Sequence, residues 1–158
     1  LIATRGIFRD ITESKKAQEQ LYQYKKFFDL SFDMVCIANT EGYFKIISPS
    51  FSKVLGYSEK ILLSKPFVEF VHPEDVPATI SEIGKLRKGD ITIDFINRYR
   101  CNNGTYLFFQ WIAVPDTHTG EIFAVARNIT EMKQAEELII KSLQEKEVLL
   151  KEVHHRAS

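Results

Sequence analysis

Two adjacent histidines, His154 and His155, are the residues of this sequence whose type and spacing most directly suggest chemistry. They lie in LLKEVHHRAS, residues 149–158, which has the composition of a charged helix. An imidazole with a pKa of about 6.5 is largely neutral at physiological pH and can offer a ring nitrogen as a nucleophile. No phosphate loop, metal cluster or identifiable base accompanies them in the sequence, so we expect the chain itself not to be an enzyme.

The cysteines and the other two histidines do not indicate a catalytic or metal-binding site. Cys36 and Cys101 lack the CxxC spacing of a zinc or redox site, and we expect two buried free thiols. His72 precedes a proline at a predicted helix start, so we interpret it as a capping or surface residue. His118 lies in the polar loop DTHTG and is expected to be solvated. No spacing of these residues predicts a metal site.

Length and charge narrow the class of protein. The 158 residues allow one domain with extensions, and Lys+Arg and Asp+Glu balance at 21 each. A net charge of zero favours neither nucleic acid nor an anionic membrane as a partner. No apolar run approaches the roughly 20 residues that span a bilayer. We therefore expect a cytoplasmic segment with no membrane contact of its own.

An internal repeat indicates how the chain is organised. GIFRDITESKKAQEQL near the start resembles FAVARNITEMKQAEEL near the end, with Asp10 aligned to Asn128. In both copies a glutamate follows three residues later, Glu13 or Glu131, which is a capping-box pattern that starts a helix. A repeat separated by a whole domain predicts that the first residues are the tail of a preceding copy. The predicted segments are this tail at 1–12, a linker helix at 13–29, the main domain at 30–130 and a signalling helix at 131–158.

The main domain is predicted to be α+β, with elements in the order β-β-α-β-β-β. The loop 39–42 and the Asn103-Gly104 pair are both able to turn a hairpin. Residues 49–87 contain short helical stretches between the two strand pairs. Sequential hairpins predict a five-stranded antiparallel sheet with these helices on one face, and with linker helices at both ends. The predicted strands are 34–38, 43–48, 91–101, 105–114 and 121–129.

Both linker helices carry apolar stripes. The stripe of the second helix resembles a short, imperfect coiled-coil seam, so we expect a homodimer formed through the linker helices. The alternative is that each helix packs on its own domain. The seam positions are Met132, Ala135, Ile139, Ser142, Lys146, Leu149 and Val153, and the first helix has Ala17, Leu21, Tyr24 and Phe28.

Four stretches in this order resemble the PAS sensory domain: DMVCIANTEGYFKIISPSFSKVLGYS, VHPEDV, NNGTYLFFQWIAVPD and AVARNIT. The resemblance runs from about residue 28 to residue 130. Two features depart from the family pattern, since Asn is more usual near Pro49 and Asp is more usual at the position of Asn128. The resemblance implies a PAS fold in which Asn128, Ile129 and Thr130 relay a signal from the sheet to the following helix.

The ending LLKEVHHR resembles the start of the phosphoacceptor helix in a histidine-kinase subfamily whose box reads His-His-Arg-Val-Lys-Asn-Asn. The match breaks at Ala157, where Val is usual. It implies a parent sensor histidine kinase of a two-component system that phosphorylates itself through its own ATP-binding domain. The phosphoryl group then passes to an aspartate of a response regulator.

Helical geometry favours His155 over His154 as the phosphoacceptor. If Val153 faces a partner helix, His155 lies about 200° around a helix with 3.6 residues per turn. It then stacks beside Lys151 and Glu152 on the solvated face, where an ATP-binding domain can reach it. In the kinase box, too, the histidine directly before Arg accepts the phosphoryl group. His154 remains the alternative.

The resemblance leaves the function of the core open. The photoreactive Asn-Cys-Arg-Phe stretch is absent, Cys36 falls on the first strand, and no histidine lies inside the helix after Pro73, so we expect neither flavin nor haem. Phe108, Phe109 and Trp111 are expected to be core residues, and a small organic ligand remains open. The alternatives to a sensor and relay are a passive dimerisation or spacer module, and a PAS domain of a cyclase or transcription regulator.

Overall fold

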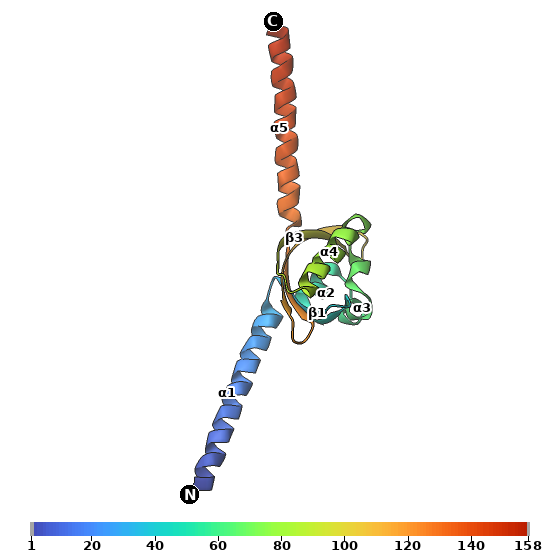
Figure 1. Ribbon diagram of the computed structural model, residues 1–158. Helices are drawn as coiled ribbons and strands as arrows, with labels where there is room; N and C mark the ends of the chain where they lie inside the picture. The colour runs from blue at the N-terminus through green and yellow to red at the C-terminus, as the bar shows by residue number, and fades with distance from the viewer. Residues whose placement is uncertain (1, 158) are drawn as a thin grey trace.

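The computed structural model describes residues 2–157, with side chains described from residue 11 onward. Its centre is a five-stranded antiparallel sheet in the order β2-β1-β5-β4-β3 (Figure 1). This confirms the predicted fold class and the predicted hairpins. The strands are β1 (Met34–Asn39), β2 (Phe44–Ile47), β3 (Thr92–Arg100), β4 (Tyr106–Asp116) and β5 (Glu121–Asn128).

Local turn chemistry closes both hairpins. Between β1 and β2, the Asn39 side-chain oxygen accepts hydrogen bonds from the backbone N–H groups of Glu41 (3.1 Å) and Tyr43 (3.0 Å). Gly42 in this turn has a φ of 97°, and Gly104 between β3 and β4 has a φ of 88°. Glycine adopts such left-handed backbone angles without a Cβ clash, which is why the turns fall where the sequence predicts them.

Short helices between β2 and β3 cover one face of the sheet (Figure 1). The hydrophobic core lies between these helices and the inward side chains of the strands, and its largest fully buried side chains include Phe51, Phe70, Phe109, Met34 and Leu62. The helices α2, α3, η1 and α4 each bury at least one side chain, so packing on the sheet helps to hold them. The helices are α2 (Pro49–Leu55), α3 (Glu59–Ser64), the 3-10 turns η1 (Phe67–Phe70) and η2 (Pro73–Asp75), and α4 (Val76–Arg87).

The opposite face of the sheet carries exposed apolar side chains. Ile112 and Val114 of β4 lie beside Val125 and Phe123 of β5 in the strand register, and Ile46 of β2 belongs to the same exposed set. Their inward neighbours are buried, as expected from the alternation of side chains along a strand.

The flanking helices α1 (Ile2–Leu30) and α5 (Thr130–Ala157) leave the domain in opposite directions (Figure 1). The predicted start of a helix at Asp10 is wrong, because α1 already begins at Ile2. The side chain of Asp10 lies outside the described residues. Assignment of 1–12 to a preceding domain stays a prediction.

Among the described helices, none is both long enough and apolar enough to cross a bilayer.

Candidate functional site

The first turn of α5 is fastened to β4 by hydrogen bonds. The Asn128 side-chain oxygen accepts from the Thr130 backbone N–H (3.2 Å) and from the Thr130 hydroxyl (2.5 Å). That hydroxyl also accepts from the backbone N–H of Phe108 (3.0 Å), whose carbonyl accepts from the Ile129 N–H (2.9 Å). Ile129 is only 4% exposed and its carbonyl accepts from the Lys133 N–H. The three predicted relay residues therefore join the helix directly to the sheet.

Strand β4 connects this junction to a cavity in the core. Phe109 is fully buried, and Trp111, two residues further along the strand, lines a cavity of about 70 Å³ between the sheet and α4. Most lining groups are apolar or aromatic. They include Cys36, Phe44, Phe67, Tyr99 and Trp111 from the sheet side and η1, and Leu86 from α4.

A hydrogen-bond chain crosses the cavity wall from β4 to α4. The Trp111 indole N–H donates to the Asn97 side-chain oxygen (2.7 Å), and the Asn97 amide donates to the Thr79 hydroxyl (3.1 Å). Thr79 in turn donates to the backbone carbonyl of Asp75 (2.8 Å). Asn97 is 2% exposed, and every buried side-chain polar atom of the described residues has a partner. This hydrogen-bond chain therefore joins four elements, β4, β3, α4 and η2, without an unsatisfied group.

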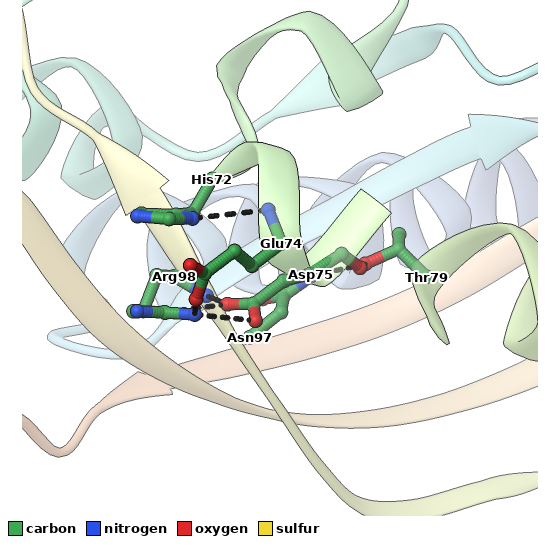
Figure 2. Close-up of polar contacts among 6 residues, drawn as sticks. All are labelled: His72, Glu74, Asp75, Thr79, Asn97 and Arg98. Atoms are coloured by element: carbon green, nitrogen blue, oxygen red, sulfur yellow. Dashed lines mark hydrogen bonds and ion pairs between the residues drawn. The ribbon is translucent and has the colours of Figure 1, made fainter. Parts of the chain in front are cut away.

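A charged cluster continues this chain to the surface (Figure 2). Arg98 donates to both carboxylate oxygens of Asp75 (2.8 Å each), and its backbone N–H also donates to Asp75 (2.8 Å). Glu74 pairs with the same guanidinium at 3.2 Å. His72 accepts from the Glu74 N–H through Nδ1 (3.1 Å), which confirms its predicted capping role.

The cluster holds the start of α4 against β3. Hydrogen bonds from the Arg98 side chain hold the pKa of Asp75 below its ordinary value, because they stabilise the ionised carboxylate against the opposing effect of burial. The pKa of Arg98 is raised in turn, chiefly by its hydrogen bond to Asp75. Bidentate pairing of this kind fixes orientation as well as charge, so Arg98 and Asp75 fix the start of α4 relative to β3.

Both cysteines lie in the hydrophobic core. Cys36 and Cys101 are both buried and free, as predicted. Burial raises the pKa of the Cys36 thiol to about 12, so the thiol stays protonated at neutral pH. Burial, and then the neighbouring Cys36, raise the pKa of Tyr99 well above its ordinary value.

The two C-terminal histidines lie far from the cavity and the charged cluster. His154 and His155 are both exposed in the last turn of α5, which points away from the sheet (Figure 1). Exposure in the single chain therefore does not distinguish them, and the choice of His155 stays a prediction. His118 is exposed in the turn between β4 and β5. Within the described part of the chain, no group of side chains could hold a metal ion.

The sequence interpretation missed the polar wall of the cavity. Asn97 lies between Phe95 and Tyr99 on the inward side of β3, and a polar residue at an inward position is a detectable signal. The pairing of Asp75 with β3 was missed as well. Its partner Arg98 is 23 positions away in the sequence, which spacing rules do not connect.

Comparisons with known proteins give one family. Residues 44–126, more than half of the chain, match the model of the family described as PAS fold. No curated protein gives a significant match.

Several solved structures share the fold. A domain of the sensory box sensor histidine kinase/response regulator from Geobacter sulfurreducens is 19% identical, with a TM-score of 0.59 and coverage of 69% of this chain and 94% of that chain. The PAS domain of an HTR-like protein from Haloarcula marismortui is also 19% identical, with a TM-score of 0.62 and coverage of 71% and 99%. Cycle PAS-B from Drosophila melanogaster, solved with bound ethylene glycol, is 24% identical, with a TM-score of 0.51 and coverage of 60% and 96%. At these identities the likeness shows the fold alone.

Proposed function

The chain belongs to the PAS fold family, and from this premise we propose that it is the sensory or signal-relay domain of a multidomain sensor histidine kinase. The observation that carries the relay is the pair of hydrogen bonds between Phe108 of β4 and the residues Ile129 and Thr130. A change in the cavity at Trp111 moves the strand that holds the root of α5. The helix then passes this change to the C-terminal segment.

The proposed output is histidine phosphorylation in the parent protein. We assign the phosphoacceptor to His155, with His154 as the alternative, on the likeness of LLKEVHHR to the kinase box. Helix α5 is continuous from Thr130 to Ala157, which supports a direct connection between the relay residues and these histidines. An ATP-binding domain and a response regulator of the parent system complete the proposed pathway.

A homodimer through the linker helices is part of this proposal. Helix α5 has no buried residue in the single chain, and its apolar residues Met132, Ile139, Leu149 and Val153 are exposed at predicted seam positions. Exposed Leu138, Leu143 and Leu150 make the apolar surface broader than the seam alone. Long helices in proteins gain most of their stability from packing an apolar face, so a partner helix supplies what the single chain lacks.

If the chain dimerises through α5, its apparent mass should depend on protein concentration, and a substitution in the seam should weaken the association. In sedimentation at micromolar concentration, we expect the chain to be a dimer, and Leu149→Glu to weaken association at least about tenfold because a charge would enter the apolar contact. Lys141→Glu places the same residue outside the predicted seam and serves as the control. A monomeric unsubstituted chain, or equal effects of the two substitutions, would contradict the proposal.

The proposed relay predicts that a substitution of Asn128 affects signal output more than its small effect on stability would explain. Removing the cap with Asn128→Ala should lower the free energy of unfolding by about 1 kcal/mol. We expect kinase output of the full-length parent to change more than ligand binding does, because the lost bonds lie between sheet and helix.

Asn128→Asp provides the matched control, since aspartate caps a helix about as well as asparagine. It should keep both stability and output near those of the parent. Unchanged output in Asn128→Ala would instead support a passive spacer module, and equal losses of output and ligand binding would indicate general destabilisation.

A further inference from the structure

We propose that Lys146 and Glu145 form a charge pair between two copies of α5, in which each Lys146 contacts Glu145 of the second copy, and that this pair sets the two helices parallel and in register. The inference rests on the homodimer of the proposed function, because it names the residues that determine its geometry. It does not depend on the kinase output, since association can be measured on the 158-residue chain.

Lys146 lies in the middle of the apolar face of α5. Ile139 and Val153, seven residues before and after it, lie within about 20° of it around the helix. The residues three and four positions away, which are its neighbours on the same face, are Ser142, Leu143, Leu149 and Leu150. A charged side chain at this place destabilises any association that buries the face, unless an opposite charge meets it.

The single chain has no opposite charge in the right place. The four neighbours of Lys146 on the helix face are a serine and three leucines, none of which carries a charge. Glu145 and Glu147 are next to it in sequence, but consecutive residues of a helix do not face each other. Helix α5 buries no residue, and the domain lies at its other end (Figure 1). An acidic partner for Lys146 therefore has to come from another chain.

A second copy of α5 supplies this acid in one arrangement. In the seam, whose spacings alternate between three and four, Lys146 is at position a of a heptad and Glu145 is at the preceding position g. In a parallel, in-register pair, the side chain at a inserts beside the a and g residues of the facing helix, so Lys146 meets Glu145 of the second copy. Two-fold symmetry makes this contact twice. Each ammonium group then reaches a carboxylate at the rim of the seam, while its methylene stem covers apolar neighbours.

A shifted register leaves one of the two lysines without an acid. A shift by one heptad places one Lys146 opposite Val153 of the second copy, and the other opposite Ile139. The g residue before Ile139 is Leu138, which is apolar and exposed in the single chain. The second lysine would then enter an apolar contact unpaired, which disfavours the shifted pair. The charge pair is therefore a register signal, which is how a single polar residue in a coiled-coil seam acts.

Mixing two charge-reversed chains tests the contact. Lys146→Glu creates two like-charged pairs in its own homodimer, and so does Glu145→Lys, whereas the heterodimer of the two variants has both pairs complementary. After mixing at equal concentration, we expect native mass spectrometry to show heterodimers at least about tenfold in excess of the statistical ratio. Lysine and glutamate are both good helix formers, so α5 should stay helical in each variant, which circular dichroism checks.

A matched pair of variants outside the seam controls for net charge. Lys141→Glu and Glu137→Lys change the charges of the two chains by the same amounts, and both residues are exposed away from positions a and d. We expect these two chains to mix statistically. The double variant Glu145→Lys with Lys146→Glu restores complementarity within one chain, so its dimer dissociation constant should return to within about threefold of that of the unsubstituted chain.

Cysteine cross-linking tests the register. Ala135 and Ser142 are at position d, where each meets its own copy across a parallel, in-register seam. A disulfide needs Cα atoms within about 7 Å. Under mild oxidation with copper phenanthroline, we expect both Ala135→Cys and Ser142→Cys to give covalent dimers, whereas Lys141→Cys gives little. The buried Cys36 and Cys101 should not compete.

A statistical mixture of Lys146→Glu and Glu145→Lys chains would overturn the proposal. Cross-linking at only one of the two cysteine positions would overturn it as well, because an antiparallel pair can bring only one of them next to its own copy. A chain that dimerises and is weakened by Leu149→Glu, but mixes statistically, would leave the proposed dimer intact. A monomeric unsubstituted chain would instead remove both the dimer and the charge pair.

Discussion

Replacing His155 by glutamine in the full-length parent is expected to abolish acid-labile phosphorylation, while His154→Gln leaves much of it. Glutamine keeps a polar side chain on the exposed helix end but has no ring nitrogen that can attack a phosphorus atom. Both residues lie on the last turn of α5, so a substitution at either should leave the domain folded. Incubation with radiolabelled ATP, followed by acid and alkali treatment, measures the phosphohistidine.

The paired substitutions make this result decisive. The reverse pattern would move the phosphoacceptor to His154, and label that survives both changes would remove the kinase interpretation of the box. The 158-residue chain alone should not label with ATP, because none of its sequence motifs predicts an ATP-binding module. Incorporation of acid-labile phosphate by this chain would contradict that expectation.

Loss of the Asn97 side chain should produce the largest fall in stability among the polar residues of the core. Asn97→Leu leaves the buried Trp111 indole N–H without its acceptor, which costs about 2 kcal/mol. Trp111→Phe removes the donor and leaves the Asn97 oxygen unpaired, with a further loss of packing at about the same total cost. Urea unfolding of the single variants measures both changes.

The double variant isolates the bond between the two residues. With donor and acceptor both removed, neither is left unpaired, so the double variant should be more stable than the sum of the single effects predicts by about 1 kcal/mol. Asn102→Leu, at an exposed position in the turn after β3, is a control expected to stay within about 0.5 kcal/mol of the parent. Strict additivity of Asn97→Leu and Trp111→Phe would show that the hydrogen bond contributes nothing.

Features set by neighbouring residues could be predicted from the sequence. The turns at Asn39 and Gly104 follow from side-chain acceptors and left-handed glycine angles, which act over a few residues. The same holds for His72, whose ring caps the turn that begins with Pro73. Once these turns and the alternating strands were placed, the antiparallel sheet followed, because each hairpin fixes the pairing of its two strands.

Features set by distant residues could not be predicted in this way. Asn97 and Thr79 are 18 positions apart, and the chain that joins them to Trp111 exists only after α4 has packed on the sheet. The start of α1 at Ile2 was missed as well, because the capping-box pattern of Asp10 and Glu13 indicates a later helix start. The cavity, likewise, is a property of the packed layers and has no signature in any single stretch.

The attachment of α5 at one end has a mechanical consequence. Its root is the single turn bonded to Phe108, about 5 Å of helix, and at 1.5 Å per residue His155 lies roughly 37 Å further along the axis. A shift of about 0.5 Å across that root tilts a rigid helix by about 5° and moves its far end by roughly 3 Å. The helix thus acts as a lever with a gain of about seven. A displacement in β4 no larger than thermal motion is therefore enlarged at His155. The enlarged movement is comparable to the difference in distance between a geometry that allows a reaction and one that does not.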